Sequence, residues 1–126
     1  SMQKELHMGK PGPVREKSYL FAVGLIRVLR QLQETDREYV LSKQCLRAGT
    51  SIGANVEEAG AGQSRKDFIA KMAIASKEAR ETHYWLRLLR DSEYLDAMMA
   101  EKLLNDCDEL IRLLTAIVKT SQSDTN

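Results

Sequence analysis

Cysteine is scarce in this sequence of 126 residues, which contains only Cys45 and Cys107. Both stand at apolar positions of helical patterns, where a cysteine usually serves as a small core side chain. A chain of this length can bury a hydrophobic core without disulfides or a structural metal. The sequence therefore predicts one domain whose two thiols lie in its core, as suits a reducing compartment.

Long apolar runs are also missing. No run approaches the ~20 residues that a helix needs to cross a bilayer, and the first residues lack the apolar segment of a signal peptide. We therefore expect a cytoplasmic protein with no membrane partner. Ser1 and Met2 are typical of an expression scar, and residues 1–13 are predicted to form a flexible lead-in.

Histidine is limited to His7 and His83. A di-iron site in a helical bundle requires Glu-x-x-His on two helices, and that motif does not occur. Nucleophilic catalysis requires a serine or cysteine beside a histidine, and no glycine-rich phosphate loop follows a strand. The sequence predicts a protein without catalytic residues, metal or cofactor.

Helical periodicity dominates what is present. Proline is absent after Pro13 and no stretch alternates like a strand, so four amphipathic helices are predicted at about residues 14–33, 37–59, 65–90 and 96–119. Short connections favour an all-α, up-down-up-down antiparallel four-helix bundle over residues 14–120. Residues 121–126 are expected to be a disordered tail.

The first helix carries more apolar surface than one buried stripe requires. Its predicted inner face consists of Ala22, Leu25, Ile26, Leu29 and Leu32. Further apolar positions are Tyr19, Leu20, Val23 and Val28. We expect this helix to be covered on two sides.

The other three helices each have one regular inner face. In the second helix these positions are Leu41, Cys45, Ala48, Ile52, Val56 and Ala59. In the third they are Phe68, Met72, Ala75, Ala79, Thr82, Leu86 and Leu89, and in the fourth Ala100, Leu103, Cys107, Leu110, Leu114 and Ile117.

Two glycines, Gly49 and Gly53, stand one turn apart inside the second helix, each at a cost of about 1 kcal/mol relative to alanine. With Ala48 they predict a surface where another backbone approaches closely.

Thr35 or Asp36 could cap this helix, and Ser64 is predicted to cap the third.

Polar side chains on the second and third helices suggest a polar contact between helices. If Arg47 and Asn55 are covered they need partners, and Glu58, Glu78 and Glu81 are the candidates. The alternative is that these glutamates pair with basic residues on solvated faces.

The net charge of +1 results from cancellation. Residues 64–90 hold seven Lys or Arg against three acids, whereas residues 91–126 hold three against eight. The third helix could therefore present a stripe that contacts phosphates, beside Tyr84. Its members would be Lys66, Lys77, Arg80 and Arg87. A solvated face is the alternative reading.

A long run of residues on the second and third helices resembles a known family. The run comprises Gln44, Arg47, Thr50–Ala59, Gln63, Ser64, Asp67, Phe68, Lys71, Ala75, Lys77–Ala79, Glu81, Thr82 and Tyr84–Leu86. It is similar to the bacterial four-helix bundle proteins encoded within ribosomal-RNA intervening sequences. That resemblance implies a ring-shaped homopentamer. It also implies a relation to the accessory variability determinant proteins of diversity-generating retroelements, which bind nucleic acid and a reverse transcriptase.

The sequence thus favours a non-enzymatic, self-associating bundle that binds structured RNA or other nucleic acid through a basic surface. The alternative is a structural or protein-interaction module, such as an adaptor for a reverse transcriptase, that binds no nucleic acid. In either case seven residues are predicted to shape the packing and contact surfaces of the second and third helices. These are Arg47, Gly49, Gly53, Asn55, Glu58, Glu78 and Glu81.

Overall fold

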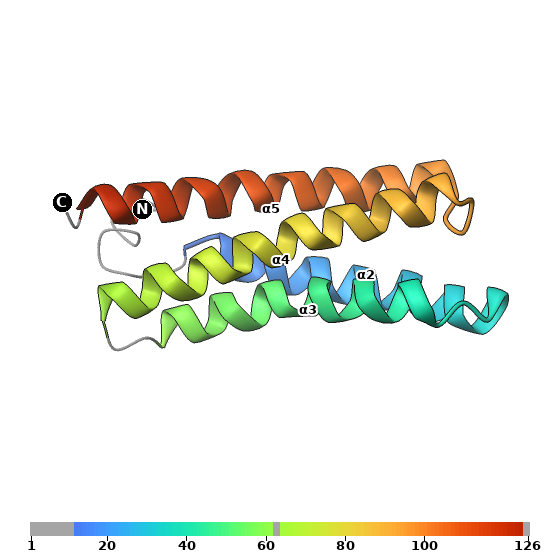
Figure 1. Ribbon diagram of the computed structural model, residues 1–126, viewed down its shortest axis with the longest axis horizontal. Coiled ribbons are helices and arrows are strands. Elements are labelled where there is room, and N and C mark those ends of the chain that lie inside the picture. The colour runs from blue at the N-terminus through green and yellow to red at the C-terminus, as the bar shows by residue number, and fades with distance from the viewer. Residues whose placement is uncertain (1–11, 62–63, 125–126) are drawn as a thin grey trace.

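Four antiparallel helices make up the fold of the computed structural model, which describes residues 12–61 and 64–124. They are α2 (Val14–Asp36), α3 (Val40–Gly60), α4 (Arg65–Asp91) and α5 (Ala97–Asp124), connected at alternate ends of the molecule (Figure 1). Each helix packs on the next along the chain and α5 packs on α2, whereas the backbones of the diagonal pairs do not come close. The predicted up-down-up-down bundle is confirmed.

The turn between α2 and α3 lies later than predicted. α2 continues to Asp36 and ends at Arg37, whose left-handed backbone (φ 56°) lets its N–H donate to the Gln33 carbonyl at 3.1 Å. Such a left-handed residue commonly closes a helix. Thr35 and Asp36 therefore belong to the last turn of α2, and the prediction that one of them caps α3 is wrong.

Glu38 caps α3 instead. Its carboxylate accepts the backbone N–H groups of Val40, Leu41 and Ser42 at 3.1, 3.0 and 2.8 Å. Partial burial by itself would raise the pKa of this carboxyl, but the hydrogen bonds from Leu41, Ser42 and Val40 together lower the pKa below its ordinary value. Stabilising the charged form in this way ties α3 to the turn before it.

The starts of α4 and α5 follow local capping rules. Ser64 caps α4 as predicted, since its hydroxyl accepts the Asp67 N–H at 3.1 Å, and Asp96 accepts the Met99 N–H at 3.0 Å. α5 continues to Asp124, so residues 121–124 of the expected tail are helical, and Ser121 is buried. The rest of that tail and residues 1–11 of the lead-in lie outside the described residues.

The core forms one continuous cluster along the bundle axis. Every predicted inner position of the third and fourth helices is buried, and so are those of the second helix except the half-buried Leu41. In α2 the predicted Leu25, Leu29 and Leu32 are buried. Val14 and Phe21 are buried as well, whereas Ile26 is 40% exposed, so the buried face is turned slightly from its prediction. Within the described residues, no helix combines the length and apolarity that crossing a membrane would require.

The two interior glycines of α3 face α2. A Cβ on Gly49 would lie 2.1 Å from Leu25 Cδ2, a distance that real atoms do not adopt. A Cβ on Gly53 would lie 3.5–3.6 Å from the hydroxyl and backbone of Ser18, an ordinary contact. A side chain at Gly49 would thus displace the buried Leu25, whereas at Gly53 the α2 backbone leaves room for a methyl group but not for a larger side chain.

The seam between α2 and α5 is looser than the other three seams. A groove with a volume of about 600 Å³ runs along it. The outward side of α2 next to this groove also lacks cover, since Tyr19 and Leu20 are 65% and 58% exposed. Residues 12–61 and 64–124 of one chain therefore do not cover α2 on the second side for which its sequence is suited.

We expect alanine to have opposite effects at the two glycines. Gly49→Ala should lower the free energy of unfolding by about 1–2 kcal/mol, because the clash with Leu25 outweighs the gain in helix propensity. Gly53→Ala should raise it by about 0.5–1 kcal/mol, because its methyl group fits. Urea unfolding of the two variants measures both. Gly53→Leu should be destabilising, since its larger side chain meets the α2 backbone, and equal stability of all three would contradict the assigned contacts.

The cap at Glu38 predicts a pH-dependent contribution to stability. Because the pKa of this group is lower in the folded chain than in the unfolded one, its stabilisation is present above about pH 4.5 and is lost as the pH falls through the folded value. Glu38→Ala should therefore cost about 1 kcal/mol at pH 7 and less at pH 3. Urea unfolding at both pH values, with the exposed Glu34→Ala as control, tests the cap. A cost that does not change with pH would contradict it.

Candidate nucleic-acid interface

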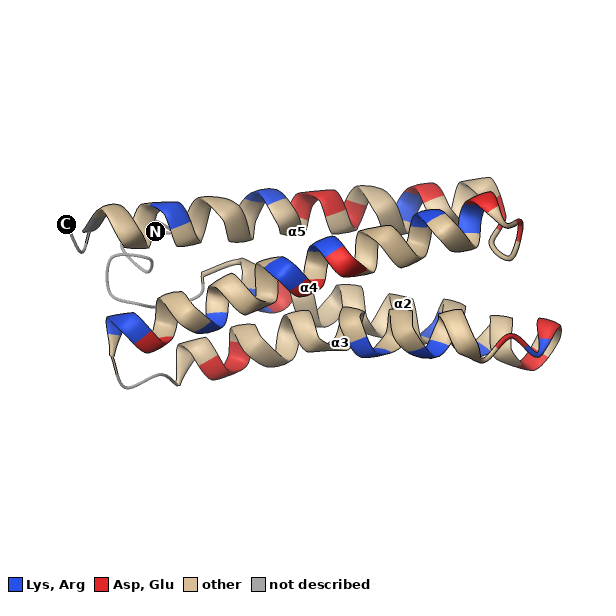
Figure 2. Cartoon of the chain, viewed as in Figure 1, with Lys and Arg blue, Asp and Glu red and all other residues tan. Residues whose placement is uncertain are grey.

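The four predicted phosphate-contacting residues lie on one outward face of α4. Lys66, Lys77, Arg80 and Arg87 are all exposed. Their spacing along the helix keeps them within one stripe, which spans ~30 Å at 1.5 Å per residue. Figure 2 shows basic residues distributed along α4 and acidic residues gathered on the middle of the adjacent α5. The structure thus brings together the basic residues that the sequence selected.

The members of this stripe differ in how they are held. The Arg87 guanidinium lies 5.8 Å from the centre of the Tyr84 ring, which itself is 48% exposed. Arg80 donates to the Thr115 hydroxyl on α5 at 3.0 Å. Lys66 and Lys77 form no ion pair with any residue that the structure describes. Two cations and a flat aromatic ring therefore remain open to a ligand.

A polar cluster lies between α3 and α4. Arg47 Nη1 is 3.2 Å from Glu78 Oε2, its Nη2 contacts Glu81 Oε2, and the same Glu81 oxygen accepts the Trp85 indole N–H at 2.9 Å. Glu78 is the least exposed of the three charged side chains, at 19%. Of the three predicted acceptors for Arg47, two are in place, and Trp85 is a donor that the sequence analysis did not assign.

Glu58 and Asn55 have other partners. Glu58 pairs with Lys71 of α4 at 2.8 Å, and the Asn55 amide donates to the Ser51 carbonyl of its own helix at 2.8 Å. Glu58 cannot reach Arg47, because eleven residues of helix separate them by ~16 Å. The expected pairing of Arg47 and Asn55 with this glutamate is therefore wrong. The sequence could have indicated Lys71 as the partner of Glu58, because in an antiparallel pair the end of α3 lies beside the start of α4.

The buried thiols do not have the character of a reactive site. Burial raises the pKa of Cys45 and of Cys107 to about 12, the latter also because Asp108 and Asp106 are near. A thiol of that pKa is protonated at neutral pH and is a poor nucleophile.

His83 is 3.0 Å from Asp108 across the seam between α4 and α5. Within residues 12–61 and 64–124, no group of His, Cys, Asp and Glu is arranged to hold a metal.

Comparison with known proteins identifies the family. The family described as 23S rRNA-intervening sequence protein matches residues 13–116. The chain belongs to this family. The match to the 23S rRNA-intervening sequence proteins includes the long motif on α3 and α4 and extends over all four helices.

A solved structure gives the same result. A protein of unknown function from the S23 ribosomal protein family of Bacteroides thetaiotaomicron VPI-5482, in a crystal structure at 1.70 Å resolution, is 49% identical to this 23S rRNA-intervening sequence protein. The match has a TM-score of 0.82 and covers 84% of this chain and 98% of the other. The search of curated proteins gave no match.

The Arg47 cluster should be worth more than an exposed ion pair. We expect Arg47→Gln to lower the free energy of unfolding by about 1 kcal/mol, because it leaves the poorly exposed Glu78 without its cation. Arg15→Gln serves as the control. It removes the ion pair between Arg15 and Glu57, whose side chains are 62% and 50% exposed, and it should cost clearly less stability than Arg47→Gln because water screens the pair. Equal losses in urea unfolding would show that Arg47 does not fasten α3 to α4.

Proposed function

We propose that this protein is a non-enzymatic helical bundle that self-associates as a homopentamer and binds structured RNA or another nucleic acid through the outward face of α4. The observation that carries the proposal is the exposed stripe of Lys66, Lys77, Arg80 and Arg87 with Tyr84 among them. Cations on a helix face neutralise phosphates, and an exposed aromatic ring can stack on an unpaired base.

The distribution of charge supports this proposal although the net charge is only +1. Two acids of the stripe's own helix, Glu78 and Glu81, are engaged with Arg47 across the α3 seam. A polyanion that approaches α4 from outside therefore meets the cations first. Several copies of the stripe in one oligomer would act together, which strengthens binding through effective concentration.

The relation to the accessory variability determinant proteins stays a prediction from the sequence resemblance. It underlies a second candidate function, a structural or protein-interaction module that serves as an adaptor for a partner such as a reverse transcriptase. The observation that favours this alternative is the uncovered apolar side of α2 at Tyr19 and Leu20, since exposed apolar patches often mark protein contacts.

Binding to RNA should depend steeply on salt and on the stripe. We expect a labelled RNA hairpin to bind in fluorescence anisotropy at 50 mM salt. The logarithm of the binding constant should fall linearly with the logarithm of the salt concentration. In a variant with Lys66→Gln, Lys77→Gln and Arg87→Gln this dependence should be shallower by about 3, one for each lost phosphate contact.

A second triple variant controls for net charge. Lys43→Gln, Arg112→Gln and Lys119→Gln remove the same charge from exposed positions outside the stripe, and binding should stay close to that of the natural sequence. Equal loss in both variants would contradict recognition by the α4 face. Absence of binding at low salt would overturn the proposal of RNA binding and leave the interaction module.

A further inference from the structure

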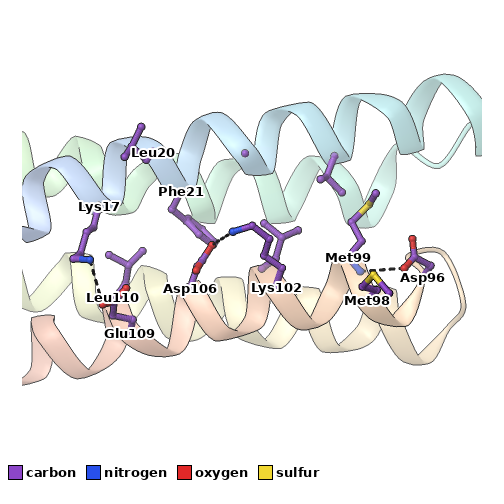
Figure 3. Close-up of a pocket in the computed structure, with 13 residues that line it drawn as sticks. Lys17, Leu20, Phe21, Asp96, Met98, Met99, Lys102, Asp106, Glu109 and Leu110 are labelled. Carbon is purple, nitrogen blue, oxygen red and sulfur yellow. Dashed lines mark hydrogen bonds and ion pairs between the residues drawn. The ribbon is translucent and has the colours of Figure 1, made fainter.

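The groove between α2 and α5 is open along most of the seam. Its floor is apolar, formed by Phe21, Leu103 and Leu110, and Met98 and Met99 lie at the end where α5 begins (Figure 3). Met98 is 84% exposed. The lining of α5 from Met98 to Leu110 is ~18 Å long, which corresponds to about three turns of a helix.

The wall on the α2 side has room for the backbone of a partner to approach closely. It consists of Leu20, Gly24 and Val28. A Cβ on Gly24 would meet nothing within 4 Å, in contrast to the two glycines of α3. Gly24 therefore leaves a hollow in the wall that no part of the same described chain fills.

The rim of the groove offers little unpaired charge. Lys17 pairs with Glu109 at 3.2 Å, and Lys102 pairs with Asp106 at 3.2 Å. Asp96 accepts the Met99 N–H as the cap of α5. With its cations neutralised, the groove suits an apolar occupant and not a phosphate or a strongly charged peptide.

The chain itself carries an apolar surface of matching size. Residues 18–26 of α2 contain no charged side chain and span ~12 Å of helix. Tyr19, Val23 and Ile26 recur at helical spacing on the side of α2 turned away from the groove. Tyr19 and Ile26 are 65% and 40% exposed. This outward face is short enough to enter the three-turn groove of another molecule.

Both surfaces expose apolar side chains among the described residues. Tyr19 and Ile26 on the outward face are 65% and 40% exposed, and Leu20, Met98 and Met99 at the groove are 58%, 84% and 38% exposed. With the half-buried lining of the groove, these side chains supply the apolar centre that a ~1,200 Å² interface requires.

We infer that the outward face of α2 in one copy, with Tyr19 and Val23, docks in the α2–α5 groove of a second copy at Gly24. This inference rests on the self-association proposed above and names its contact surface. The inserted face and the receiving groove lie on different sides of the same helix, so the contact is head-to-tail. Contacts of that kind close into a ring when the rotation permits.

Two variants separate the two sides of this contact. Gly24→Lys fills the groove, and its ordinary backbone conformation accepts a side chain without strain. Tyr19→Lys places a charge on the inserted face. Each should weaken self-association at least about tenfold in sedimentation velocity, with unchanged helix content by circular dichroism. Tyr39→Lys changes a tyrosine of similar exposure, 51%, in the turn between α2 and α3 and should leave association unchanged.

A mixture of the two variants gives the decisive result. Gly24→Lys keeps an intact inserted face and Tyr19→Lys keeps an intact groove, so an equimolar mixture should form heterodimers that neither variant forms alone. The natural assembly should also persist at 1 M salt, because its contact is apolar. Monomers in the mixture, or association unchanged in either variant, would overturn the inference and leave self-association standing. A monomeric natural protein would overturn both.

Discussion

The close packing of α2 against α3 at Gly49 and Gly53 is the constraint that positions α2 in the bundle. Since α3 presents no side chain at these positions, Leu25 lies directly against Gly49 and the Ser18 backbone lies over Gly53. α2 is thereby held close to α3, while its seam with α5 remains open. The same small residues that make one seam tight thus leave a groove on the other side of the helix.

The two surfaces with functional potential use different residues. The basic stripe occupies the outward face of α4, whereas the apolar face belongs to α2 and the groove to α2 and α5, and the backbones of α2 and α4 do not come close. They also rely on different forces, since phosphate contacts weaken with salt whereas apolar burial does not. Ring formation through α2 and RNA binding through α4 can therefore occur on one molecule without competition for the same residues.

Polar residues show how far a sequence can define a candidate site. The helical spacing of Lys66, Lys77, Arg80 and Arg87 was enough to place them on one face, because that relation is internal to α4. The pairs between helices were only partly predictable. Arg47 meets Glu78 and Glu81, but Glu58 takes Lys71, since pairing depends on the register of two antiparallel helices. Likewise Glu38 caps α3 because α2 continues past Thr35.

The sequence by itself determined the all-α class, the order of the helices and the buried faces of the third and fourth helices, because periodicity and capping act within a few residues. In α2 the inward position of Leu25, Leu29 and Leu32 was also predicted, but only the tertiary structure decided the final rotation of the helix. Phe21 is buried and Ile26 is exposed, although both belong to an apolar run without charges. When a helix is apolar on most sides, its rotation is set by the neighbours that it packs against, here the glycines of α3, and the groove at Gly24 follows from that rotation.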